Sequence, residues 1–332
     1  MVRTVTDELV IGVDAGGTAT RCLVATTDGT PLRRGTAGGA NPRSAGGEPA
    51  EALAEALHAA LSGVDRSRVA CGVVGIAGAG AAGRSAAVAA TTAAWRAAGL
   101  TGQVVTVTDL EVAFAAGTPA RSGLLLLAGT GAVAAACRDG AVVHRCDGYG
   151  WLLGDEGSAV WLGREGLRRV LAGLDRRAAP TALTGPVTEL LTGSAPPPGD
   201  AQAHAQALIA AAHALPPAAL GRLAPLVADA AATGDRAARD VVDEAVERLL
   251  HALDTVAREA PGVHPAVVLA GSVLLSPGPV ADGVRAGVRH RWGVAPDLGS
   301  DGAAGAAALA IARLRGRAVP AQVHARLTGA AR

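Results

Sequence analysis

Two glycine-rich turns, each set between apolar runs, are the feature that most constrains the fold of this chain. The first lies in IGVDAGGTATRCLVA, residues 11–25, and the second in LLLLAGTGAVAAA, residues 124–136. Apolar runs joined at glycines predict β-hairpins, because glycine adopts tight-turn conformations that a side chain forbids. A further apolar run follows each hairpin. The sequence therefore predicts a set of three antiparallel strands that occurs twice.

Strand and helix patterns alternate after each set of three strands. Strand-like runs cover 68–78 and 103–109 in the first half and begin the segment 266–280 in the second. This order predicts a mixed α/β sheet in each half. Helical spacing covers 50–63, 84–99, 110–117, about 155–173, 201–213, 216–260 with breaks, and 302–316.

We therefore expect an α/β protein built from two duplicated domains with a cleft between them. The N-terminal domain takes residues 1–120, and the C-terminal domain takes 121–316 with helical insertions. The final helix, about 302–316, can pack back on the N-terminal domain, and 317–332 form a loosely held tail. A cleft between two hinged halves suits an enzyme.

Charge and hydropathy argue against several classes of protein. The net charge is +1 and the pI about 7.8, so no basic surface for a nucleic acid is expected. The longest aliphatic run, LLLLA at 124–128, is far shorter than the roughly 18 apolar residues of a membrane span. The N-terminus MVRTVTDELV has no signal-peptide core. A soluble, cytoplasmic protein without a membrane partner is the expectation.

The cysteines and histidines form no recognisable metal-binding pattern. Cys22, Cys71, Cys137 and Cys146 lie far apart without a C-x-x-C pair, and the eight histidines show no ligand spacing. Free thiols are therefore expected. One iron–sulfur cluster shared between two subunits stays an open alternative.

The chain contains no lysine, so all 30 basic residues are arginine. The P-loop motif and the protein-kinase motif both need a lysine and are therefore absent. A nucleotide bound by this chain needs backbone amides for most of its phosphate contacts. Asp14 beside the first glycine turn suits this chemistry, because turn amides bind an anion while the acid holds the water shell of a magnesium ion. A glycine hairpin with a solvated acid is the alternative.

Together these motifs resemble those of the sugar kinase, Hsp70 and actin superfamily. Within it the chain is similar to the N-acetylglucosamine kinase group, often placed with the BadF/BadG-type ATPases. The resemblance covers nearly the whole chain, and it implies duplicated ribonuclease H-like domains of the actin-like ATPase type. GDEGS is its most specific segment. The matching residues are VDAGGTATR at 13–21, Asn41 in GGANP, TDLEVAFAAG at 108–117, AGTGA at 128–132, GYGWLLGDEGSAVWLGREGL at 148–167 and AGSV at 270–273.

The resemblance implies that the two glycine hairpins hold the phosphates of ATP from opposite domains. It assigns Asp14 to Mg²⁺, mainly through water, and the Gly271-Ser272 turn with Ser276 to adenosine. A helix N-cap is the alternative role for Ser276. ATP and Mg²⁺ are thus the expected cofactors. The expected phosphate contacts are Gly16, Gly17 and Thr18 in one hairpin and Gly129, Thr130 and Gly131 in the other.

Asp109 ends a strand pattern and begins a helical one. It suits a helix N-cap, a position that Asp fills well. In the family pattern the matching aspartate accepts the proton of the sugar hydroxyl that attacks the γ-phosphate. Both roles are compatible at a strand end beside a cleft, and we expect Asp109 to be the catalytic base.

The sugar is expected to bind around the GDEGS segment. The resemblance assigns Asp155 to the sugar hydroxyls, whereas the alternative role is to favour the N-terminus of the next helix. Tyr149 and Trp151 lie near this segment in a chain with 2% aromatic residues, which favours carbohydrate contact, and Trp161 is expected in the core. The remaining expected sugar contacts are Asn41, Gly78, Asp109, Gly148 and Gly150.

The predicted reaction is transfer of the γ-phosphate of ATP to the 6-hydroxyl of N-acetylglucosamine, by a homodimer. Ala77 stands where relatives often have serine and Asp147 where glycine is common, so the preferred sugar stays open. Glucosamine and N-acetylmuramic acid are alternative substrates. An ATPase activator or a non-catalytic sugar sensor of the same fold are alternative functions. Arg21 and Arg164 are expected in surface salt bridges, and contact with phosphate or substrate is their alternative role.

Overall fold

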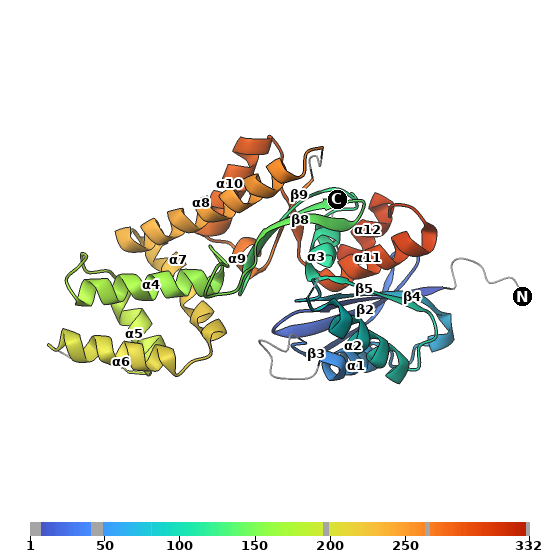
Figure 1. Cartoon of the computed structure of the whole chain (residues 1–332), viewed down its shortest axis with the longest axis horizontal. Coiled ribbons are helices and arrows are strands. Elements are labelled where there is room, and N and C mark those ends of the chain that lie inside the picture. The colour runs from blue at the N-terminus through green and yellow to red at the C-terminus, as the bar shows by residue number, and fades with distance from the viewer. Residues whose placement is uncertain (1–7, 41–48, 81, 195–198, 263–265, 330–332) are drawn as a thin grey trace, which may run out of the picture.

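The computed structural model describes residues 8–40, 49–80, 82–194, 199–262 and 266–329, and Asn41 lies outside them. Two five-stranded sheets with packed helices form the molecule (Figure 1). Their strand orders are β3-β2-β1-β4-β5 and β10-β9-β6-β7-β8. The first sheet contains β1 (Leu9–Ala15), β2 (Ala19–Thr26), β3 (Pro31–Gly38), β4 (Val69–Ile76) and β5 (Gln103–Thr108), and the second contains β6 (Gly123–Ala128), β7 (Ala132–Arg138), β8 (Ala141–Asp147), β9 (Val267–Ala270) and β10 (Asp297–Gly299).

The two sheets repeat one topology. In the first sheet β1, β2 and β3 pair antiparallel, and β4 and β5 run parallel to β1. In the second sheet β6, β7 and β8 pair antiparallel, and β9 and β10 run parallel to β6. Strand β1 therefore corresponds to β6, and each later strand has its counterpart. The predicted duplication of a mixed α/β fold is confirmed.

Helices cover both faces of the first sheet. Successive side chains of β1 point to opposite faces, so alternate residues of this strand pack in two different cores. Ile11 and Val13 pack in one core with residues of α1 (Pro49–Ala60) and α2 (Arg84–Ala97). Val10 packs in the other core with α11 (Gly302–Arg315). A short 3₁₀ turn, Arg66–Arg68, precedes β4.

The helices of the second half share one large core with the second sheet. Trp161 is 5% exposed in this core, as expected from the sequence. No described helix is long and apolar enough for a membrane crossing. The helices are α4 (Ala159–Leu174), α5 (Thr184–Thr192), α6 (Ala201–His213), the 3₁₀ segment Pro217–Leu223, α7 (Ala224–Thr233), α8 (Arg236–Glu259), α9 (Ser272–Leu275) and α10 (Pro279–Trp292).

Helices α3 (Asp109–Gly117) and α11 join the two halves of the molecule. Helix α3 follows β5 of the first sheet yet also contacts β6, β9 and β10, whereas α11 follows β10 yet packs on β1, β2 and β4. A Cβ at Gly305 of α11 would strike the Val112 carbonyl of α3, and one at Gly12 of β1 would strike the Ala303 carbonyl of α11. Both contacts therefore join backbone to backbone, which only glycine permits at these positions.

The segment after α11 contains a further helix, α12 (Ala321–Thr328), so the expectation of a loosely held tail is wrong there. Val323, His324 and Leu327 are buried against the first half of the molecule. The Nε2 atom of His324 lies 2.8 Å from the Ala115 carbonyl oxygen of α3. Three buried side chains on one short helix hold this segment in place.

Replacing Gly305 by Ala is expected to lower the free energy of unfolding by about 1–3 kcal/mol, because the added methyl group meets the α3 backbone. Gly185→Ala is the matched control. Gly185 lies in α5 with nothing near its missing Cβ, and alanine there is expected to stabilise by roughly 0.5–1 kcal/mol. Thermal and urea unfolding measure both variants. An unchanged melting temperature for Gly305→Ala would show that this contact does not hold α3 to α11.

Candidate active site

Asp14 lies at the carboxyl end of β1, where the first glycine turn begins. The Gly16 N–H closes this turn by donating to the Ala19 carbonyl at 3.0 Å. Burial raises the pKa of Asp14 to about 6; the charge of Arg21 opposes this rise and that of Asp301 adds to it. The described residues hold no group of three or more His, Cys, Asp or Glu side chains that could ligate a metal directly. One carboxylate fits a Mg²⁺ ion held mainly through water.

Gly16 and Gly129 are glycines that neither packing nor backbone conformation requires. Neither has a left-handed φ. A Cβ at Gly16 would meet nothing closer than the Ala19 carbonyl oxygen at 3.4 Å, and one at Gly129 nothing closer than the Ser272 nitrogen at 3.7 Å. The missing side chains therefore leave room beside the backbone of both turns. Binding of phosphate by turn amides needs such an approach.

Asp109 is the first residue of α3 but not its N-cap. Thr108 fills that position: its hydroxyl accepts from the Glu111 N–H, and the Glu111 carboxylate accepts from the Thr108 N–H at 2.7 Å. The N-cap alternative for Asp109 is therefore wrong. Burial, and then the charge of Asp14, raises the pKa of Asp109 to about 6. The backbone N–H groups of Asp109 and Leu110, which donate to the carboxylate, and the charge of Arg145 oppose this rise in pKa.

The second glycine turn contacts the turn predicted to bind adenosine. Gly271 has a left-handed φ of 87°, and a Cβ there would strike the Ala128 carbonyl. Ser272 lies beside Gly129 in the same contact. Ser276 is exposed and is the C-cap of α9, its N–H donating to the Ser272 carbonyl at 3.0 Å. The N-cap alternative for Ser276 is therefore wrong.

Asp155 reaches from the GDEGS segment to the second glycine turn. Its carboxylate accepts hydrogen bonds from the backbone amides of Ala132 and Gly150, and a Cβ at Gly131 would lie 2.8 Å from Oδ2. Burial is the largest influence on Asp155 and raises its pKa above the ordinary value despite these bonds. Ser158, three residues later, caps α4. Asp155 thus links the predicted sugar loop to a predicted phosphate turn.

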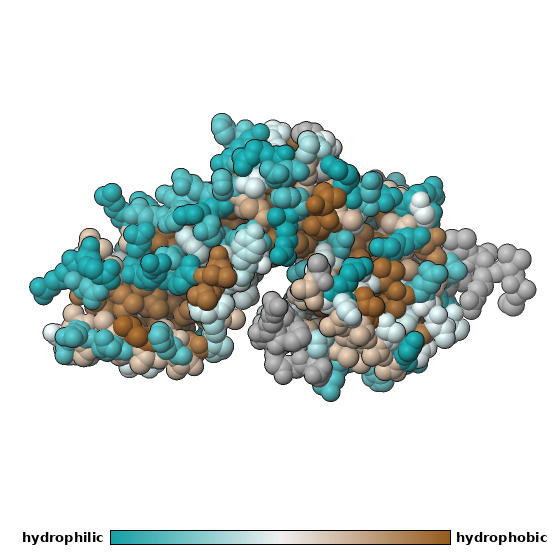
Figure 2. Space-filling model, in the orientation of Figure 1, coloured by the Kyte–Doolittle hydropathy of each residue, from teal (hydrophilic) through white to brown (hydrophobic). Residues whose placement is uncertain are grey.

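The carboxyl ends of the two sheets meet at the start of α11. Asp301 follows β10, caps α11 by accepting from the Ala304 N–H at 3.1 Å, and forms an ion pair with Arg34 of β3 at 2.7 Å. A Cβ at the next residue, Gly302, would strike the Asp14 carboxylate. Figure 2 shows the surface hollowed between the part that carries α4 to α6 and the part that carries the first sheet.

The other predicted sugar contacts lie at exposed turns. Gly78 is exposed with a φ of 84°, and the neighbouring Ala77 N–H donates to the Ala15 carbonyl at 2.9 Å, which ties this turn to the end of β1. Tyr149 is 65% and Trp151 42% exposed. The contacts described above join the first glycine hairpin to the turn at Ala77, and the second hairpin to Gly271 and Asp155. Joint binding of one triphosphate by both hairpins stays a prediction.

Sequence reasoning missed two features of this region. The capping box at Thr108 and Glu111 has a readable signal, because T-x-x-E before an apolar run is typical of a helix start. Asp301 had only a weak signal, an acid before a helical pattern. Its ion pair with Arg34 joins residues far apart in sequence, and no local pattern predicts such a pair.

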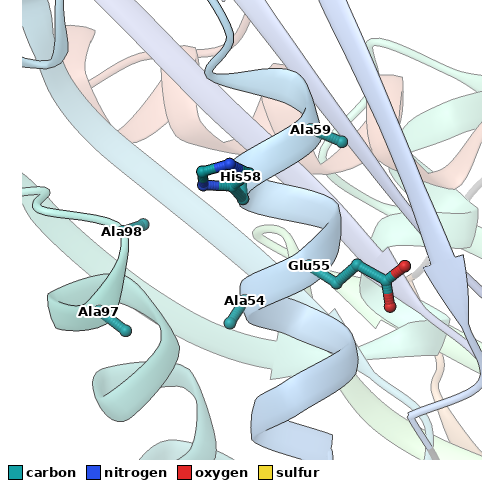
Figure 3. A pocket seen from close by; sticks show the side chains of 6 residues that line it. All are labelled: Ala54, Glu55, His58, Ala59, Ala97 and Ala98. Carbon is teal, nitrogen blue, oxygen red and sulfur yellow. The ribbon is translucent and has the colours of Figure 1, made fainter.

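A separate hollow lies between α1 and α2, away from these residues (Figure 3). Its volume is about 390 Å³. None of the predicted site residues contributes to it, so it is not part of the candidate site. Its lining consists of Ala54, Glu55, His58, Ala59, Ala97 and Ala98.

A family comparison decides the relationship of the chain. The profile of the BadF/BadG/BcrA/BcrD ATPase family matches residues 11–310, which include both glycine turns, Asp109 and the GDEGS segment. The chain belongs to this family. The matched residues include strands of both sheets. The resemblance to the BadF/BadG-type ATPases that the sequence motifs predict is therefore confirmed.

Individual relatives of this family member are sugar kinases by name. An N-acetylmuramic acid/N-acetylglucosamine kinase of Clostridium acetobutylicum is 30% identical over 183 residues, which span 55% of this chain and 60% of that relative. The match thus spans less than two thirds of the curated relative. The structure of a protein from Chromobacterium violaceum, named as a candidate N-acetylglucosamine kinase, is 28% identical to this chain with a TM-score of 0.72. The match covers 91% of this chain and 98% of the Chromobacterium violaceum chain.

The fold class is confirmed by a more distant structure as well. A ROK family glucokinase from Streptomyces griseus, solved with glucose and AMPPNP, has a TM-score of 0.56 at 20% identity. The match covers 91% of this chain and 99% of the glucokinase chain. At this identity the likeness concerns the fold alone. It agrees with the duplicated α/β architecture of the two sheets described above.

Asp109→Asn is expected to raise thermal stability at neutral pH. A carboxyl whose pKa rises from 3.8 to about 6 on folding binds more protons in the folded state between those values, so stability falls as the pH rises through this window. Asn avoids that loss, which is at most about 3 kcal/mol for a carboxyl that keeps some solvent contact.

Melting temperatures of both proteins from about pH 4 to pH 8 measure this effect, with the gap expected to widen as the pH rises. Asp139→Asn, at an exposed aspartate, is the control and should show no such trend. A gap that stays constant with pH would contradict the raised pKa of Asp109.

Proposed function

We propose that this chain is an ATP-dependent kinase that transfers the γ-phosphate of ATP to the 6-hydroxyl of N-acetylglucosamine. The observation that carries the proposal is the position of Asp109 at the start of α3 and the raised pKa of its carboxyl. This half-buried acid is not the N-cap of α3, although its carboxylate bonds to the backbone N–H groups of Asp109 and Leu110, and it lies close enough to Asp14 for the two charges to interact, where the two sheets converge. The names of the relatives from Clostridium acetobutylicum and Chromobacterium violaceum support a sugar as the acceptor.

Asp109 acts as the general base in this proposal. With a pKa of about 6 it is mostly ionised at neutral pH and still basic enough to take a proton from an attacking hydroxyl. The hydroxyl oxygen then bonds to the γ-phosphorus as the bond to the β-phosphate oxygen breaks and ADP leaves. The capping box at Thr108 and Glu111 fixes the start of α3 and therefore the direction of the Asp109 side chain.

Backbone groups supply most of the phosphate contacts in this lysine-free chain. The open sides of the turns at Gly16 and Gly129 admit phosphate oxygens, and Gly271 and Ser272 place a third turn beside the second. Mg²⁺, held through water on Asp14, would supply the positive charge that the turns lack. Asp155 would accept hydrogen bonds from sugar hydroxyls at the acceptor sites that its two bonds to backbone amides leave free, because a carboxylate has about four such sites.

The cysteines disfavour the alternative of an activator with a shared iron–sulfur cluster. Cys22, Cys71 and Cys137 are buried, and burial raises the pKa of Cys22 and of Cys137 to about 12. Only Cys146 among the four has partial exposure. A cluster between subunits needs several thiolates at the surface. A homodimer, a division into domains at about residue 120 and a cytoplasmic location remain parts of the proposal.

A sugar panel tests the proposed acceptor. Coupled ADP release with N-acetylglucosamine, glucosamine, N-acetylmuramic acid and glucose, each with Mg-ATP, should give the highest kcat/KM for N-acetylglucosamine. Phosphorus NMR of the product identifies the phosphorylated hydroxyl. Equal turnover with and without every sugar would make the chain an ATPase and end the kinase proposal, whereas a preference for another amino sugar would change only the substrate.

Replacing Asp109 by Asn is expected to lower kcat by roughly a hundredfold to ten-thousandfold, the usual contribution of a general base. Binding of the sugar, measured by calorimetry, should change little, because Asn has the same shape and can still accept a hydrogen bond. Asp139→Asn should retain full activity, since Asp139 is an exposed residue in a distant turn. Wild-type turnover in Asp109→Asn would refute the assigned base.

A further inference from the structure

The loop between β8 and α4 contains several left-handed backbone angles, two of them at aspartates. Left-handed φ angles are costly for residues with a side chain, although Asp tolerates them better than most. Without fixed contacts, such a loop would sample other conformations. Five residues from 147 to 157 have such angles: Asp147 at 65°, Gly148 at 76°, Gly150 at 91°, Asp155 at 56° and Gly157 at 82°.

The Asp147 carboxylate ties the two ends of this loop together. Its Oδ1 accepts from the Asp155 N–H at 2.8 Å, and its Oδ2 accepts from the Glu156 N–H at 2.8 Å. A Cβ at Gly154 would strike Oδ1, so glycine at that position lets the carboxylate approach the loop backbone. Both carboxylate oxygens therefore bind backbone inside the loop, and Asp147 is committed to the loop's shape.

These two hydrogen bonds set the position of the Asp155 side chain. They fix the nitrogens on either side of the Asp155 α-carbon. From there the Asp155 carboxylate reaches the backbone amides of Ala132 and Gly150. A second tie is independent of Asp147, because Arg164 of α4 donates to the Trp151 carbonyl at 2.7 Å. Loss of Asp147 would therefore loosen the 154–157 end while the middle of the loop stays attached.

We propose that Asp147 is a positioning residue for sugar binding, which holds the Asp155 carboxylate at the second glycine turn by pinning the backbone of residues 155 and 156. This inference rests on the proposed function, because it assumes that Asp155 binds the sugar. It makes the sugar site depend on Asp147 more than the nucleotide site does, because the Gly129 N–H donates to the Gly131 carbonyl and the Ala159 N–H donates to the Gly129 carbonyl, each at 2.8 Å, and these bonds hold the second glycine turn without Asp155. A direct contact between Asp147 and the sugar is the competing explanation, and the two differ in the sugar-free protein.

Asp147→Gly tests the inference, since glycine keeps the left-handed backbone and removes both acceptors. The KM for the sugar should rise at least about tenfold, the scale of losing hydrogen bonds to a charged group, while the KM for ATP should change less than about twofold. Hydrogen exchange of peptides that cover 148–158 should become faster in the sugar-free variant. Asp147→Asn keeps one acceptor and should fall between wild type and Asp147→Gly in both measurements.

Asp139→Gly is the matched control, because Asp139 also has a left-handed φ, 53°, and lies in the exposed turn between β7 and β8. It should leave the KM values and the exchange of 148–158 unchanged. A raised sugar KM without faster exchange would overturn the inference in favour of direct contact. An unchanged sugar KM in Asp147→Gly would overturn it outright. If the wild-type protein phosphorylates no sugar, the proposed function fails first, and that result is visible before any variant is compared.

Discussion

The architecture depends on backbone-to-backbone contact at the crossing of α3 and α11. Each of these helices follows a strand of one sheet and packs on the other half of the molecule. Each sheet is therefore covered in part by a helix that follows the last strand of the other sheet. Gly305 permits the approach of α11 to α3, and Gly12 of β1 permits the approach of α11 to the first sheet, because any side chain at either position would meet a carbonyl group. The same crossing brings Gly302, after the second sheet, against Asp14 at the end of the first. Packing in the core thus places the carboxyl ends of both sheets in one region.

The electrostatics of this region follow from acids that packing holds partly out of water. Asp14 and Asp109 each have a pKa near 6, mainly through burial, and each is influenced by a further acid. Nearby cations are arginines, and Arg34 is already paired with Asp301. A site of this kind favours a bound cation, because positive charge near Asp14 would favour the ionised form of both acids. The ionisation of the proposed base and the binding of a metal–nucleotide are therefore coupled in this reading.

Most of the fold was predictable from sequence because its signals are local. The glycine turns and the alternation of strand and helix each depend on neighbouring residues, and together they predicted the duplicated topology. Helix α12 was missed because burial of its side chains depends on α3 and the first sheet. At the site, the sequence marked Asp147 as unusual but could not show that its carboxylate binds the Asp155 and Glu156 amides. Contacts that depend on a loop's path, or on two distant segments, carry no local pattern.

Each half of the molecule carries an acid where its last strand leads into a helix, and helix capping gives the two acids different roles. Asp109 follows β5 at the start of α3, and Asp301 follows β10 at the start of α11. Asp301 caps α11 and pairs with Arg34, so both of its oxygens have structural partners. At α3 Thr108 and Glu111 form the capping box instead, so Asp109 is not the N-cap, and its carboxylate bonds to the backbone N–H groups of Asp109 and Leu110. An aspartate thus holds the N-cap position at α11 and a threonine holds it at α3, where the acid one residue later, Asp109, is the candidate base.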